Sequence, residues 1–231
     1  MPIKAVLFDM DGVLLNSEPL HDEVNLQILR EEGIEADSSV TDPYVGRTSE
    51  AMWGDLIEQL HLTKSIDSLI ERQWADVIRA LPHSGIEASE GLLDLLTYME
   101  DHFIRATIAS SSRGAFVEAV LRYLRIERFF EGYTCGEDIV HSKPAPDIFL
   151  LAARKLGVSP SECLVIEDSS AGVRAGKAAG MFTVGYRNPT SEGQDVSVAD
   201  VTVMHLSDIR HILAEKNAVA DADSLFLNIS T

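Results

Sequence analysis

Short apolar runs alternate along most of the chain with stretches in which apolar residues recur every three or four positions. Six apolar runs have the length of buried strands and lie at 3–8, 104–109, 131–135, 163–166, 181–185 and 201–203. Five stretches with helical spacing separate or follow them, at 91–101, 115–124, 147–156, 171–179 and 207–215. Strands that alternate with helices predict an α/β fold, in which helices cover both faces of a parallel sheet.

The segment between the first strand and the second has helical spacing alone. Three apolar stripes occur in it, at 24–29, 52–60 and 69–78. An all-helical block at this place predicts a cap over the carboxyl end of the sheet, where open α/β folds bind ligands. The expected organisation is core 1–16, helical cap 17–88 and core 89–216. Residues 217–231 begin with small and polar side chains and are expected to form a loose tail.

The net charge and the length of the apolar runs limit the kinds of partner that the protein can bind. A net charge of −18 opposes binding to nucleic acid or to an anionic membrane, since both attract basic surfaces. No apolar run approaches the roughly 18–20 residues that cross a bilayer, and the start lacks a signal-peptide layout. We expect a cytoplasmic monomer whose partner is a small molecule. The two cysteines, Cys135 and Cys163, are expected to be small buried side chains.

Two carboxylates follow the first predicted strand. Asp9 and Asp11 stand two residues apart, and Gly12 allows a sharp turn after them. Carboxylates placed in this way can bind a hard cation, attack phosphorus or transfer a proton. A purely structural turn is the alternative for this pair taken alone.

Three other predicted strands also end in functional groups. Ser110 and Ser111 follow one strand, Lys143 lies in the loop after another, and Glu167 and Asp168 end a third. Each has a plainer alternative, a helix cap for the serines and acids and a solvated loop residue for the lysine. Taken together they supply an attacking oxygen, phosphate-binding donors, a cation and ligands for Mg²⁺. These are the components that phosphoryl transfer requires.

Gly172 and Gly176 superficially suggest a nucleotide-binding loop. The spacing between the two glycines is too short for such a loop, and an alanine stands where Mg²⁺ needs a hydroxyl. Both glycines also fall within a predicted helix, so close packing of that helix on the sheet is the better interpretation.

Three segments carry a resemblance to a known family: FDMDGVLLNSEPLH, SKPAPDIF and IEDSSAGVRAGKAAG. Together they resemble the haloacid-dehalogenase superfamily, within the subgroup that includes β-phosphoglucomutase and small sugar-phosphate phosphatases. The match extends from Val6 to about Gly185. It implies a Rossmann-like core with a four-helix cap inserted after the first motif.

The resemblance also implies a role for each candidate residue. Asp9 would be the nucleophile and Asp11 the general acid and base. Ser110 and Lys143, with Ser111 beside them, would hold the transferred phosphate. Mg²⁺ would lie between Asp9, the backbone carbonyl of Asp11, Asp168 and Glu167. His21 matches a histidine at the hinge of the cap, with a packing role as the alternative.

The cap loop separates two activities that share these residues. A phosphohexomutase has basic residues there, which hold the distal phosphate of a sugar bisphosphate. In this chain Val45 and Ser49 replace two of them and Arg47 remains, while Arg113 in the core loop replaces a lysine. We therefore expect a Mg²⁺-dependent phosphatase of small phosphate esters, most of all sugar phosphates, acting through an aspartyl-phosphate on Asp9. A β-phosphoglucomutase-type mutase and a non-catalytic phosphometabolite-binding protein are the alternatives.

Overall fold

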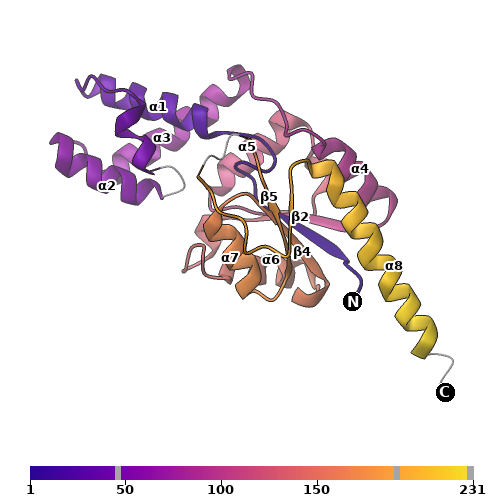
Figure 1. The fold of residues 1–231 in the computed structure, drawn as a ribbon. Helices are drawn as coiled ribbons and strands as arrows, with labels where there is room; N and C mark the ends of the chain where they lie inside the picture. Colours follow the sequence, from indigo (N-terminus) through magenta and orange to yellow (C-terminus); the bar gives the residue numbers. More distant parts are fainter. Residues whose placement is uncertain (45–47, 190–192, 228–231) are drawn as a thin grey trace.

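A parallel sheet forms the centre of the molecule. The computed structural model describes residues 1–231 except 45–47, 190–192 and 228–231, and it describes 219–227 by their backbone alone (Figure 1). Among the described residues six strands pair in the order β3-β2-β1-β4-β5-β6, and every pairing is parallel. The strands are β1 (Ala5–Phe8), β2 (Arg105–Ala109), β3 (Tyr133–Thr134), β4 (Cys163–Glu167), β5 (Phe182–Tyr186) and β6 (Val201–Val203). The predicted α/β fold is confirmed.

Both faces of the sheet are buried, which explains why the strands are apolar throughout instead of alternating. Val6 and Phe8 of β1 belong to one apolar cluster, and Ala5 and Leu7 belong to the other. The first cluster includes side chains of α4 (Leu92–Asp101), α5 (Gly114–Leu124) and α8 (Ile209–Leu227). The second includes side chains of α6 (Asp147–Leu156) and α7 (Ser170–Ala178). Short 3₁₀ turns link these elements at Glu127–Phe129, Gly136–Asp138, Pro160–Glu162 and Leu206–Asp208.

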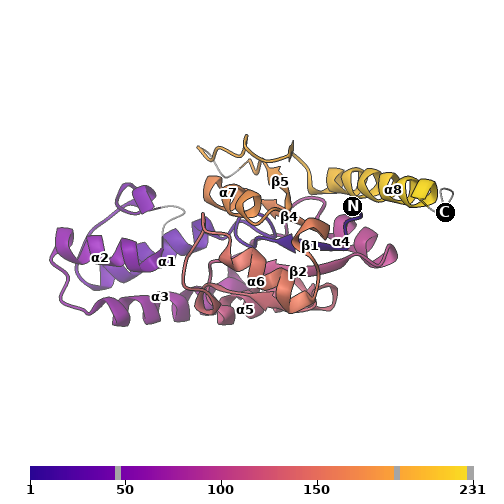
Figure 2. The ribbon, with the colours of Figure 1, turned by 90° about the horizontal axis from the view of Figure 1, so that it is seen from below.

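Three helices follow β1 and group at one end of the molecule, away from α8 (Figures 1 and 2). They are α1 (Glu18–Glu31), α2 (Ser49–Leu60) and α3 (Ile66–Ala80), with 3₁₀ turns at Ser38–Val40, Asp42–Tyr44 and Leu81–His83. The described part of this segment thus holds three α-helices, whereas the resemblance implied four. A buried Gln73 joins them: its amide accepts from Trp53 Nε1 at 3.1 Å and donates to Asn25 Oδ1 at 2.8 Å.

The C-terminal segment differs from the loose tail that was expected. Helix α8 continues to Leu227, so residues 217–227 are helical, and Ile209 and Leu213 near its start pack in the apolar cluster on the sheet. Asn217 anchors the helix to the chain start, accepting from Ile3 N at 2.7 Å and donating to Ile3 O at 3.2 Å. None of the described helices combines the length and the apolar character that crossing a bilayer demands. Cys135 and Cys163 are both buried and unpaired with each other, as predicted.

Candidate active site

The chain turns sharply after β1. The N–H of Asp9 donates to the carbonyl of Ile166 on β4 at 3.0 Å, which continues the sheet by one residue. Gly12 adopts a left-handed conformation (φ 81°) that glycine accepts without strain. A methyl group on Gly12 would overlap the Asp168 carboxylate, so the missing side chain lets the turn approach that acid closely. The turn therefore places Asp9 beside the end of β4.

Three buried acids meet at this edge of the sheet. Carboxylate oxygens of Asp9, Glu167 and Asp168 lie within 4.8 Å of one another, which makes them the one set of potential metal ligands found among the described residues. They converge because Phe8 of β1 pairs in register with Ile166 of β4, so both strands end at the same level. A methyl group on Gly172 would overlap the Glu167 carboxylate, so α7 needs glycine here to make room for that acid. This confirms that Gly172 serves packing.

Lys143 supplies positive charge to the acids. Its ammonium group donates to Asp9 Oδ1, to Glu167 Oε1 at 2.6 Å and to the carbonyl of Ala109 at 3.1 Å, and its side chain is 8% exposed. Burial alone would lower the pKa of Lys143, but the carboxylates of Asp9 and Glu167 outweigh it and raise the pKa above its usual value. Burial raises the pKa of Asp9, and the Lys143 ammonium opposes that rise. One ammonium faces several carboxylates, so the set fits an additional hard cation bound by oxygen ligands.

The carboxylate of Asp11 is oriented by two serines that sequence reasoning did not single out. Ser17 Oγ, at the entry to α1, donates to Asp11 Oδ1, and Ser112 Oγ donates to Asp11 Oδ2 at 2.6 Å. Both serines are buried. The available signal for Ser17 is its place at the N-cap of α1, and for Ser112 its place in the serine run after β2. Through the Asp11 carboxylate, these two hydrogen bonds connect the start of α1 with the loop after β2.

The predicted phosphate-binding serines lie in that same loop. Ser110 is buried, its N–H donates to Thr134 O at 3.0 Å, and its hydroxyl accepts from the N–H of Ser112 at 3.1 Å. Ser111 is exposed. The loop follows β2 directly and thus lies next to the ends of β1 and β3. Their phosphate-binding role stays a prediction.

Two of the predicted substrate-contacting residues, His21 and Arg113, lie where the three helices after β1 meet α5. The His21 ring packs edge-to-face on Trp74 of α3 and Phe116 of α5, at centroid distances of 5.4 and 5.3 Å. Burial lowers the pKa of His21, and nearby Asp11 opposes this. Arg113 pairs with Glu71 of α3 at 2.7 Å. Arg47 lies outside the described residues.

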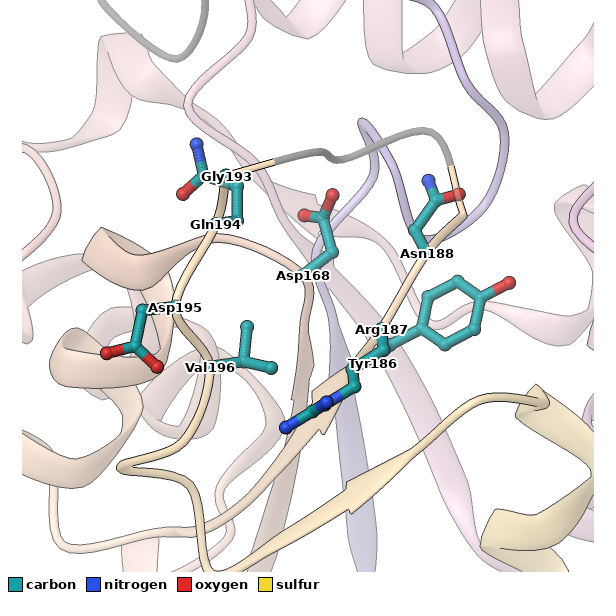
Figure 3. Close-up of a pocket in the computed structure, with 8 residues that line it drawn as sticks. All are labelled: Asp168, Tyr186, Arg187, Asn188, Gly193, Gln194, Asp195 and Val196. Carbon is teal, nitrogen blue, oxygen red and sulfur yellow. The ribbon is translucent and has the colours of Figure 1, made fainter.

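A pocket of about 420 Å³ borders Asp168 on the side of β5 (Figure 3). Asn188 lies on its wall, and its side-chain amide donates to the carbonyl of Gly12 at 2.8 Å. Sequence reasoning missed Asn188, since its partner stands 176 residues earlier in the chain. The other lining residues are Tyr186, Arg187, Gly193, Gln194, Asp195 and Val196.

Known proteins resemble the chain over most of its length. A family model described as haloacid dehalogenase-like hydrolase matches residues 3–180. Fructose-1-phosphate phosphatase YqaB of Escherichia coli (strain K12) is 30% identical over 185 residues, 79% of this chain and 96% of that protein. Beta-phosphoglucomutase of Bacillus subtilis (strain 168) is 32% identical over 216 residues, 90% of this chain and 92% of the mutase.

Two further comparisons concern chain length and fold. The chloroplastic protein SUPPRESSOR OF QUENCHING 1 of Arabidopsis thaliana is 35% identical over 195 residues, 82% of this chain, which spans 18% of that relative. The crystal structure of CbbY from Rhodobacter sphaeroides in complex with phosphate has a TM-score of 0.80 at 23% identity. It covers 90% of this chain and 96% of its own, which shows a shared fold.

Proposed function

Because the chain belongs to the haloacid dehalogenase-like hydrolases, we propose that it is a Mg²⁺-dependent phosphatase of small phosphorylated metabolites, with sugar phosphates as the substrate class. The cluster of Asp9, Glu167 and Asp168 around the Lys143 ammonium carries this proposal, because it joins a buried carboxylate to the cationic groups that a phosphate dianion needs. The fructose-1-phosphate phosphatase among the relatives supports the substrate class.

Asp9 is the proposed nucleophile. Its carboxylate oxygen attacks phosphorus and forms an aspartyl-phosphate, while the bond between phosphorus and the leaving oxygen breaks. The Lys143 ammonium, fixed between Asp9 and Glu167, offsets the charge of the incoming phosphate. The serine loop after β2 offers the hydroxyls of Ser110 and Ser111 to the phosphate oxygens.

Asp11 is the proposed general acid and base. It gives a proton to the leaving oxygen in the first step and takes one from the attacking water in the second. The hydroxyls of Ser17 and Ser112 hold its carboxylate in a defined orientation before substrate binds. Because Ser17 precedes α1, movement of the three-helix cap is coupled to the position of this carboxylate.

Asp9, Asp168 and Glu167, with the backbone carbonyl of Asp11, would hold the Mg²⁺ ion. When bound, it supplies the positive charge that lets a carboxylate approach a phosphate dianion. The three side chains offer the oxygen ligands that this ion prefers, and Gly12 and Gly172 leave room for two of them.

The decisive experiment follows phosphate release over a panel of phosphate esters and then traps the intermediate. Wild type should require Mg²⁺, lose activity in chelator, and after acid quenching carry phosphate on the peptide that contains Asp9. Asp9→Asn should lose turnover because an amide cannot attack phosphorus. Asp101→Asn, at the exposed end of α4, is the matched control and should behave as wild type. Activity of Asp9→Asn, or full activity in chelator, contradicts the proposal.

A mutase is the second candidate, supported by the identity to the Bacillus subtilis enzyme. Phosphatase and mutase differ in what accepts the phosphate from Asp9, water or a sugar hydroxyl. Ser49, at the first turn of α2, stands where a mutase has a basic residue, and Arg113 is engaged with Glu71. Both features favour water as the acceptor.

A further inference from the structure

The loop that follows β5 is tied to the candidate active site at two points. On one side, the amide of Asn188 donates to the carbonyl of Gly12 at 2.8 Å. On the other, Gln194 Oε1 accepts from the N–H of Ser170 at 2.9 Å, and Ser170 Oγ accepts from the N–H of Asp195 at 2.7 Å. The loop therefore contacts two turns that come from different strands.

Both contacted turns hold metal-binding candidates. Gly12 belongs to the turn that begins with Asp9 and packs against the Asp168 carboxylate. Ser170 opens α7, two residues after Asp168. In Figure 3 the Asp168 side chain lies between Gln194 and Asn188 at the edge of the pocket. The loop thus brackets Asp168 and links it to the turn of Asp9.

The negative charge of the three acids gives these loop contacts a role. Asp9, Glu167 and Asp168 repel one another when they are ionised, and Lys143 contacts Asp9 and Glu167. Like charges at this distance push their backbone segments apart unless other contacts hold them. Side-chain amides can hold those segments without adding charge of either sign. Groups that orient metal ligands in this way commonly change metal affinity about 10- to 100-fold when they are removed.

We propose that Asn188 and Gln194 are positioning residues that fix Asp168 relative to Asp9 and so set the affinity of the site for a divalent cation. The inference rests on the proposed function, because that function supplies the cation. The contacts that carry the inference are both with backbone atoms, the Gly12 carbonyl and the Ser170 N–H. Each acts through the backbone, Asn188 on the turn after β1 and Gln194 on the first residue of α7.

The test measures cation binding in the whole protein, separately from catalysis. Mn²⁺ binding to metal-free protein is followed by electron paramagnetic resonance, and Mg²⁺ binding by competition. Asn188→Ala and Gln194→Ala should each weaken binding about tenfold. Gln194→Glu keeps the acceptor for the Ser170 N–H and should bind at least as tightly as wild type. Ser197→Ala, an exposed change on the same loop, is the control and should leave binding unchanged.

Kinetics add a second measurement that general destabilisation would not reproduce. The alanine variants should need more Mg²⁺ for half-maximal activity, yet approach the wild-type kcat and KM at saturating Mg²⁺. If one alanine variant does not fold, the cation affinity of the other alanine variant decides the test. Wild-type affinity in the folded alanine variants overturns the inference and leaves the proposed function intact. Failure of the wild-type protein to bind either cation overturns both.

Discussion

At the scale of single residues, Asp9 occupies a place where negative charge is costly. Burial raises its pKa, Lys143 opposes the rise, and Glu167, Asp168 and Asp11 add to it. A carboxyl whose pKa is higher in the folded state than in the unfolded chain binds its proton more tightly when folded. In metal-free protein the stability associated with Asp9 is therefore present below the ordinary carboxyl pKa. It is lost as the pH rises through the raised pKa.

We therefore expect Asp9→Asn to stabilise the metal-free protein at neutral pH while it abolishes turnover. The amide is neutral, so the free energy of unfolding should rise at neutral pH, and the gain should shrink as the pH is lowered. Urea unfolding in chelator at several pH values measures it, with Asp101→Asn as the control. A loss of stability at neutral pH would mean that the ion pair with Lys143 outweighs burial.

Gly172 tests the packing of Glu167. A methyl group added there overlaps the buried carboxylate, so Gly172→Ala should lower the free energy of unfolding by about 1–3 kcal/mol and weaken cation binding. Gly54→Ala in α2 is the matched change, because its methyl would meet just Ile66 Cδ1, at 3.7 Å. It should be neutral or stabilising by up to about 1 kcal/mol. Equal changes in the free energy of unfolding for the two variants would show that the Glu167 side chain moves aside without loss of stability.

At the scale of elements, α8 and β1 hold the two ends of the described core together. Asn217 makes both of its amide contacts with the backbone of Ile3, just before β1 begins. Asn217→Ala removes both bonds, so the free energy of unfolding should fall by about 1–2 kcal/mol. Glu215→Ala, exposed on the same helix, should change it by less than about 0.5 kcal/mol. Chemical denaturation compares the two, and equal values would mean that water replaces both bonds.

Helices α3 and α5 join the three-helix group after β1 to the helices that cover the sheet. Trp74 of α3 contacts Phe116 of α5 at a centroid distance of 5.7 Å, and the Arg113–Glu71 ion pair adds a polar contact at the start of α5. The ion pair is largely exposed on the Glu71 side, so it contributes little to stability. In this arrangement the Arg113 guanidinium, a proposed substrate contact, is paired with Glu71.

At the scale of the whole molecule, the acceptor of the phosphate decides the activity. A mutase must hold the distal phosphate of a bisphosphate while the sugar turns, and charge-assisted contacts would provide that hold. Val45 and Ser49 bring no positive charge to that hold, and the net charge of −18 repels a bisphosphate outside the local site. We therefore expect water to accept the phosphate.

We expect stoichiometric phosphate release from hexose phosphates, without stimulation by catalytic glucose 1,6-bisphosphate. The assay supplies β-glucose 1-phosphate with a trace of the bisphosphate and measures free phosphate against glucose 6-phosphate. Asp9→Asn in the same assay corrects for contaminating activity. Glucose 6-phosphate formed at high turnover with little free phosphate would identify a mutase.

The sequence by itself determined the order of strands and helices and the groups at the strand ends. Apolar runs and helical spacing are local properties, so the strands and helices of the core lie within a few residues of their predicted positions, apart from the C-terminal end of α8. In a parallel sheet, neighbouring strands end at a common edge. The meeting of Asp9, Lys143, Glu167 and Asp168 therefore followed from sequence order and the resemblance together.

Tertiary structure alone decided which groups support that cluster. Ser112 and Asn188 find their partners 101 and 176 residues away, Asp11 and Gly12 respectively. Helix α8, whose end was expected as a loose tail, is likewise held by distant partners, by the apolar cluster near its start and by Ile3 at Asn217. A hydrogen bond between distant segments depends on how whole elements pack, and the spacing of residues along the chain contains no record of it.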